Sequence, residues 1–351
     1  NQRSILIHAD TKLVDDPLDV SQIERVPNPS FDREMRSEGV TCATCHVRVQ
    51  DGNSVVVASR SSGRAPHPVR SDAKALQNVC LRCHDPGPGK ITPQFFCWFE
   101  TAREGKAHGV KQNCVECHMP PVTRPLVGGS PARKTRHHYW TGGGVPKTFD
   151  GYDTLLDRDY IPGGVLTASL ERGVLNISLE NKHAGHHLTS ADPERYVWVQ
   201  TVLVDETGKE YTLDTQRFAQ EWDWGSSEPV RPARRLQDSR IPAGQSKSWS
   251  VKLPNTIREL RVTAAHVRLA PQNAKHMKGT VIPKAIGELW PDAAATVARL
   301  EHVYPFLTFF AEQTYTAESE RWSSTPLSEL LERSKGLKGT PISDYADLLG
   351  P

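Results

Sequence analysis

Six of the seven cysteines lie in three copies of one pattern, C-x-x-C-H. Two thiols on one short turn can form thioethers with the two vinyl groups of a haem, and the next histidine then lies beneath the iron as its proximal ligand. The pattern predicts three covalently bound haem c groups, each with its iron. The residues concerned are Cys42, Cys45, His46, Cys80, Cys83, His84, Cys114, Cys117 and His118.

Two other uses of paired cysteines fit less well. A structural zinc site takes four ligands, which does not account for a histidine directly after every pair. Disulfides between such closely spaced cysteines would be poor long-range crosslinks. The seventh cysteine, Cys97, stands among aromatic residues in QFFCWFE and is predicted to be a buried structural thiol.

Each proximal histidine leaves one axial position open, and histidines elsewhere in the chain are candidates for it. Met35, Met119 and Met277 are the only methionines, so bis-histidine ligation is expected at most sites. His67 stands between two prolines, which hold the backbone extended. His108 is predicted at the end of a helix over residues 94–108, with Gly109 as its cap.

Adjacent side chains diverge, so only one of His137 and His138 is expected to face an iron. We favour His138, because Trp140 and the glycines at 142–144 would let the chain close over a porphyrin edge. Three more histidines, at positions 183, 186 and 187, lie in NKHAGHHLTSADPERY. They are either ligands or part of a polar loop.

The composition predicts two kinds of structure along the chain. Residues 1–150 are expected to form a mostly irregular and helical triheme domain, and residues 151–275 an antiparallel β-sandwich, because short segments there alternate apolar and polar residues. DETG, directly after Val204, is a good hairpin turn. Residues 276–351 are predicted to be a helical segment, with a long helix over 291–322 and a shorter one over 326–335.

Charge argues against several partner classes. The formal net charge is +2, from 43 basic and 41 acidic residues, which gives no basis for binding nucleic acid or an anionic membrane. No apolar run is long enough to cross a bilayer. Covalent haem attachment takes place outside the cytoplasm in bacteria and archaea, so we expect a periplasmic, cell-surface or extracellular protein.

Several segments resemble a group of bacterial multihaem c-type cytochromes, distantly related to the haem-packing cores of cytochrome c nitrite reductase and hydroxylamine oxidoreductase. They are EGVTCATCHVR, APHPVR, CVECHMP, HHYWTGG and NKHAGHHLTSADPERYVWV, within roughly residues 38 to 200. The resemblance implies that His67, His138 and His186 are axial ligands, and that a β-domain ends near residue 270. Gly185 would let the backbone at His186 approach a porphyrin, with His183 and His187 as polar neighbours.

These features favour an electron carrier with redox proteins as partners and no catalytic residues. One alternative is an oxidoreductase in which a single open haem acts on a small nitrogen or sulfur oxyanion or on a peroxide. Another is a subunit of a larger electron-conducting assembly, built by self-association or within a respiratory complex.

Overall fold

The computed structural model forms two compact units, which are described separately. The first unit comprises Asn1–Arg103, Lys111–Trp140 and Asp223–Arg234, and the second comprises Glu104–Val110, Thr141–Trp222 and Arg235–Pro351. The structure describes residues 4–8, 23–27, 41–50, 53–59, 67–85, 87–90, 96–125, 128–138, 161–190, 192–223, 226–227, 230–231, 234–254, 256–282, 291–304 and 306–350.

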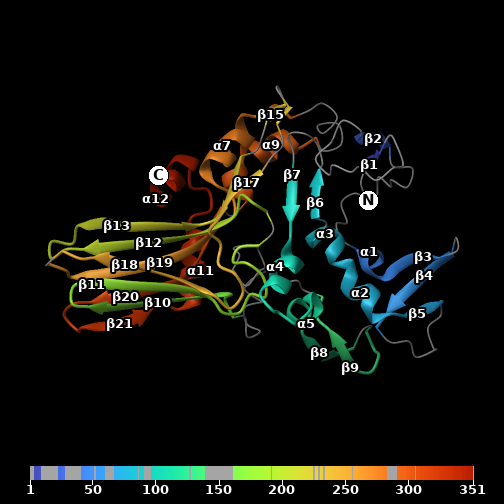
Figure 1. Ribbon diagram of the computed structural model, residues 1–351, viewed down its shortest axis with the longest axis horizontal. Coiled ribbons are helices and arrows are strands. Elements are labelled where there is room, and N and C mark those ends of the chain that lie inside the picture. The colour runs from blue at the N-terminus through green and yellow to red at the C-terminus, as the bar shows by residue number, and fades with distance from the viewer. Residues whose placement is uncertain are drawn as a thin grey trace. The chain divides into compact units, whose positions relative to one another are not determined.

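Short helices and short strands make up the described part of the first unit (Figure 1). Its helices are α1 (Cys42–His46), α2 (Ala73–Val79), α3 (Leu81–His84) and α5 (Cys114–His118). Its strands are β1 (Ser4–His8), β2 (Ile23–Pro27), β3 (Val47–Gln50), β4 (Asn53–Ala58), β5 (Val69–Ser71), β6 (Gly87–Lys90), β7 (Phe96–Phe99), β8 (Pro121–Arg124), β9 (Arg133–Arg136), β15 (Ser226–Ser227) and β16 (Val230–Arg231). Among the side chains described here, Val57 is the one apolar residue that is fully buried. These residues therefore form no aliphatic core.

The helix predicted over residues 94–108 is wrong in its first half. Residues Phe96–Phe99 form strand β7, which pairs with β6, and helix α4 covers only Thr101–Ala107. The aromatic run in β7 favours a pleated strand, and this preference outweighs the helical pattern that follows. The predicted end of the helix is confirmed, because Gly109 has a φ of 74° directly after it.

Two antiparallel sheets dominate the second unit (Figure 1). One has the strand order β10-β11-β18, and the other has the order β13-β12-β19-β20-β21. Their strands are β10 (Gly164–Glu171), β11 (Val174–Asn181), β18 (Ser246–Lys252), β12 (Tyr196–Val204), β13 (Glu210–Phe218), β19 (Glu259–Val267), β20 (Leu307–Thr316) and β21 (Arg321–Ser324). Strands β14 (Gln220–Asp223) and β17 (Arg234–Asp238) form a separate pair at the boundary of the unit.

The two sheets share a hydrophobic core, which is formed by the side chains that alternate toward the inside along each strand. In β11, Leu175, Ile177 and Leu179 are buried while the intervening side chains are more exposed. They pack in one cluster with Val199 of β12 and Val262 of β19. Burying side chains of this size contributes about 1.5–3 kcal/mol each, so this alternation, visible in the sequence, is sufficient to fix which face of β11 points inward.

The hairpin turn predicted after Val204 is confirmed. Strands β12 and β13 pair with Val204 opposite Glu210. The Asp205 carboxylate accepts hydrogen bonds from the backbone N–H groups of Thr207 and Lys209, at 2.8 and 3.0 Å. Gly208 has a φ of 85°, a conformation that favours glycine.

The long helix predicted over residues 291–322 is wrong. Two short helices, α9 (Ala293–Ala298) and α10 (Leu300–Val303), are followed by strand β20, which pairs with β19 along its length. Pro305 follows Tyr304, and a residue before proline is driven out of the helical region; Tyr304 is extended, with φ −128° and ψ 122°.

Helices cover the other face of the five-stranded sheet. They are α7 (Pro271–Gly279), α11 (Leu327–Gly336) and α12 (Ile342–Leu349). The Phe309 N–H donates to the Ser334 hydroxyl at 2.9 Å, and Trp198 Nε1 donates to the Leu349 carbonyl at 3.0 Å. Residues 276–351 thus contribute both helices and sheet to this unit. Among the helices that the structure describes, none has the length and apolar character needed to cross a membrane.

Candidate haem sites

Each C-x-x-C-H frame forms a single short helix of the first unit: the first and third frames are α1 and α5, and the second is α3 with its N-cap. His46, His84 and His118 are the last helical residues of α1, α3 and α5, and Cys80 is the N-cap of α3. Asn113 and Glu116 form a reciprocal capping box that fixes the start of α5. One helical turn therefore carries both cysteines and the histidine, as haem attachment requires.

The described cysteines of the three frames differ in their exposure to solvent. Cys42 and Cys117 are exposed, Cys45, Cys80 and Cys114 are partly buried, and none of these five forms a disulfide. The side chains of Cys83 and Cys97 lie outside the described part of the structure.

The second and third frames lie close together, as a hydrogen bond between the side chains of Cys80 and Cys114 shows. This bond, followed by burial, raises the pKa of Cys80, and it lowers the pKa of Cys114 to about 6.

His46 has the orientation expected of a metal ligand. Its Nδ1 donates a hydrogen bond to the carbonyl oxygen of the buried residue Val57 in β4, at 2.8 Å. Histidines that bind a metal through one ring nitrogen commonly hold the other on a backbone carbonyl, which fixes the tautomer and the ring direction. The bond places the proton on Nδ1, so Nε2 is the nitrogen through which His46 would bind an iron, and the residues of the first frame fit a haem.

His138, one of the predicted distal ligands, lies near His46 in the first unit. The two ring centroids are 6.2 Å apart, with 33° between the ring planes. His138 Nδ1 donates to the Arg136 carbonyl at 3.0 Å. Trp140 and the glycines at 142–144, which supported the choice of His138, lie outside the described residues.

The other three histidines proposed from the first unit, His67, His84 and His118, differ in exposure. His67 and His84 are exposed, and His118 is half-buried. His67 precedes β5, and its Nδ1 donates to the Pro68 carbonyl at 3.4 Å.

His108 meets His187 within the second unit, a contact that no sequence pattern predicted. The Gln245 side-chain amide donates to His108 Nδ1 at 3.2 Å, and the Nε2 atoms of His108 and His187 are 3.4 Å apart. Both ring nitrogens of His108 therefore have protein partners, an arrangement that does not support His108 as an iron ligand.

A buried carboxylate organises the loop that contains His186. Glu104 Oε2 accepts hydrogen bonds from the His187 N–H at 3.2 Å and from the Ser190 hydroxyl at 2.8 Å. Its Oε1 accepts from Arg240 Nη1 at 2.7 Å. The Glu104 and Arg240 side chains are only 5% and 1% exposed.

These contacts hold the peptide group between His186 and His187 from both sides. Asn181 Nδ2 donates to the His186 carbonyl at 2.7 Å, while Glu104 accepts from the following N–H. Gly105 and Gly185 pack closely, since a Cβ on Gly105 would lie 2.3 Å from the Gly185 carbonyl oxygen. The backbone at His186 is consequently fixed.

Electrostatics keep this cluster charged at Glu104 and neutral at His187. Burial raises the pKa of Glu104. The charge of Arg240 and the hydrogen bond from Ser190 lower this pKa by a larger amount, so the net shift is downward. Burial lowers the pKa of His187 more than the charge of Glu104 raises it. Sequence reasoning missed Glu104 and Arg240, because a lone charged residue in a helix or loop carries no signal of burial.

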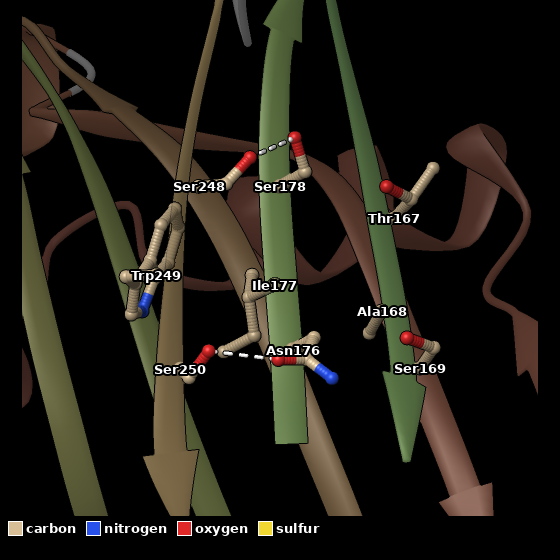
Figure 2. A pocket seen from close by; sticks show the side chains of 9 residues that line it. All are labelled: Thr167, Ala168, Ser169, Asn176, Ile177, Ser178, Ser248, Trp249 and Ser250. Carbon is tan, nitrogen blue, oxygen red and sulfur yellow. Dashed lines mark hydrogen bonds between the residues drawn. The ribbon is translucent and has the colours of Figure 1, made fainter. Parts of the chain in front are cut away.

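No group of three or more His, Cys, Asp or Glu side chains in the described residues is arranged to hold a metal ion. A hollow on the outer face of β10-β11-β18 is lined by small polar side chains, with Ser248 bonded to Ser178 and Ser250 to Asn176 (Figure 2). Its lining contains no titratable residue. The hollow offers no acid, base or metal ligand for chemistry.

Comparisons with known proteins give only distant likenesses. No protein-family model matches the sequence, and the search of curated proteins gives no match. A penta-heme cytochrome c552 from Thermochromatium tepidum is similar at 17% identity and a TM-score of 0.43, over 73% of this chain and 63% of the cytochrome's length.

Two further structures are similar over a smaller part of the chain. The hypothetical protein PH1083 from Pyrococcus horikoshii OT3 (12% identity, TM-score 0.16) and a superoxide reductase in the oxidized state (10% identity, TM-score 0.17) each cover 29% of this chain, and 75% and 76% of their own lengths. All three TM-scores are below 0.5.

Proposed function

We propose that this chain is a triheme c-type cytochrome that transfers electrons between redox proteins outside the cytoplasm. The observation that carries the proposal is that each of the three C-x-x-C-H frames forms one short helix ending at its histidine, with His46 held on a backbone carbonyl in the manner of a metal ligand. The absence of an aliphatic core among the described side chains of the first unit also supports it.

Haem supplies an iron that cycles between the ferric and ferrous states. The chain would hold each haem through two thioethers and a proximal histidine, and a distal ligand, burial and hydrogen bonds would set the potential of the iron. We propose His67, His138 and His186 as distal ligands, which would leave no iron open to a substrate. His108 is not retained, because both its ring nitrogens are bonded within the second unit.

The two sheets of the second unit are proposed to form a β-sandwich that serves as a docking or assembly module. Their shared core supports this description. Buried charged side chains described in this unit pair with one another, as Glu104 does with Arg240. Pairing of this kind suits a structural scaffold.

The test is a spectroscopic redox titration of the purified protein, with and without carbon monoxide. The proposal predicts low-spin spectra in both oxidation states, reversible reduction of all the iron, and no carbon monoxide complex. Stoichiometric binding of carbon monoxide at one haem of the native protein would favour the open-haem oxidoreductase instead. Cys97→Ala should behave as the native protein, because Cys97 lies outside the three frames.

A further inference from the structure

We infer that His46 and His138 are the two axial ligands of the same iron, that of the haem attached to Cys42 and Cys45. The inference rests on the proposed function, since it requires that the first frame holds a haem. It adds a pairing of proximal and distal ligands that neither the motif spacing nor the resemblance provides. Three observations within the first unit carry it.

The first observation is the separation of the two imidazoles, 6.2 Å between ring centroids. With each metal–nitrogen bond about 2 Å long and each ring nitrogen roughly 1 Å from its ring centre, imidazoles on opposite sides of one metal have centres about 6 Å apart. Histidines that bond each other directly lie closer. His108 and His187 illustrate this, with centroids 5.4 Å apart and Nε2 atoms 3.4 Å apart.

The second observation is that both rings are oriented alike by backbone carbonyls. His46 Nδ1 donates to the Val57 carbonyl at 2.8 Å, and His138 Nδ1 donates to the Arg136 carbonyl at 3.0 Å. Each bond fixes the tautomer in which the proton is on Nδ1 and the lone pair is on Nε2. In both residues Nε2 is therefore the ligating nitrogen.

The third observation is the structure that holds His138 in place. Strands β8 and β9 form a hairpin in which Pro121 pairs with Arg136, and the next N–H, of His137, donates to the Pro120 carbonyl at 2.9 Å. Arg136 Nη1 donates to two carbonyls of α5 and its C-cap, those of Val115 at 3.3 Å and Met119 at 3.1 Å. The hairpin is thus anchored to the third frame and presents His138 to the first.

The experiment compares His138→Ala with His137→Ala in the haem-loaded protein. We expect His138→Ala to convert one low-spin haem to a form that binds about one carbon monoxide per chain when reduced, because one iron has lost its sixth ligand. Added imidazole should restore the low-spin spectrum. His137→Ala should bind none, because adjacent side chains diverge. A His138→Ala protein that stays fully low-spin would overturn the inference.

A second arm identifies which haem is affected. In a Cys42→Ser/Cys45→Ser background, which lacks the first covalent haem, adding His138→Ala should create no new carbon monoxide site. If a new site still appears there, His138 serves another iron, and the pairing is overturned while the carrier function stands.

A third variant keeps a ligand at position 138 and serves as the test if the Cys42→Ser/Cys45→Ser protein does not fold. His138→Met should keep the haem low-spin and raise the potential of one haem, since a methionine ligand favours the ferrous state. An unchanged set of potentials would contradict the pairing. Absence of haem from the native protein would instead remove the proposed function itself.

Discussion

Replacing Glu104 with glutamine tests the most deeply buried ion pair among the described residues of the second unit. The substitution keeps the size of the side chain and removes its charge. It replaces one of the two acceptor oxygens with an NH₂ group, which can only donate. The two oxygens of Glu104 accept hydrogen bonds from Arg240, Ser190 and the His187 N–H. At least one of these donors must lose its partner.

The magnitude follows from burial and from the partner that remains. Removing one member of a buried pair costs about 3–5 kcal/mol, because the other charge stays buried. Arg240 keeps Asp238, to which Nε and Nη2 donate at 2.9 and 2.7 Å. We therefore expect the lower end, about 3 kcal/mol in the free energy of unfolding, which is more than a hundredfold in the equilibrium constant.

The assay is urea unfolding followed by far-ultraviolet circular dichroism. The matched control is Glu210→Gln, whose carboxylate is 60% exposed and bonded to Arg261 at 2.6 Å, and which should cost less than about 1 kcal/mol. Equal losses for the two single variants would refute the reasoning.

Three further predictions concern the same loop and its surroundings. Gly105→Ala should lower the free energy of unfolding by about 1–3 kcal/mol, because its Cβ would lie 2.3 Å from the Gly185 carbonyl oxygen. The matched control is Gly336→Ala, whose new Cβ would meet no neighbouring side chain or loop within 4 Å, so it should not destabilise the protein. A greater loss of stability in Gly336→Ala than in Gly105→Ala would contradict the packing argument. His186→Ala should expose one iron to carbon monoxide while the exposed His183→Ala does not; two identical spectra would exclude His186 as a ligand. Stability should be level above about pH 7 and fall at lower pH, because the His187 imidazole and the buried carboxyls all have a lower pKa in the folded chain, so the unfolded chain takes up their protons first. The loss should begin as unfolded His187 is protonated and continue as acid protonates the carboxylates. Unfolding measured from pH 8 to 3 checks this, and a level profile would contradict it. The carboxylates concerned are Glu104, Asp238 and Glu312.

The sequence predicts the sheets well where one face of a strand is buried. Alternation in β11 and the turn after Val204 are both confirmed, because each depends on neighbouring residues. Strand β20 was missed, because it begins with a run of buried residues that alternation does not mark. Pro305 was the available signal, since it disfavours a helix through Tyr304.

The candidate site was predictable only where it is local. The C-x-x-C-H frames are contiguous, so the spacing itself identifies their chemistry. Glu104 and Arg240 are separated by 136 residues, and His108 and His187 by 79 residues. Partners so far apart meet only through the tertiary fold, and nothing in either local sequence indicates the other.

Intact mass of the protein under denaturing conditions tests the central claim most directly. Thioether-bound haem stays on the chain when the fold and the axial ligands are lost. The account predicts the mass of the polypeptide plus three haem groups, one for each C-x-x-C-H frame. A mass equal to the bare polypeptide, or to one carrying fewer than three haems, would contradict it.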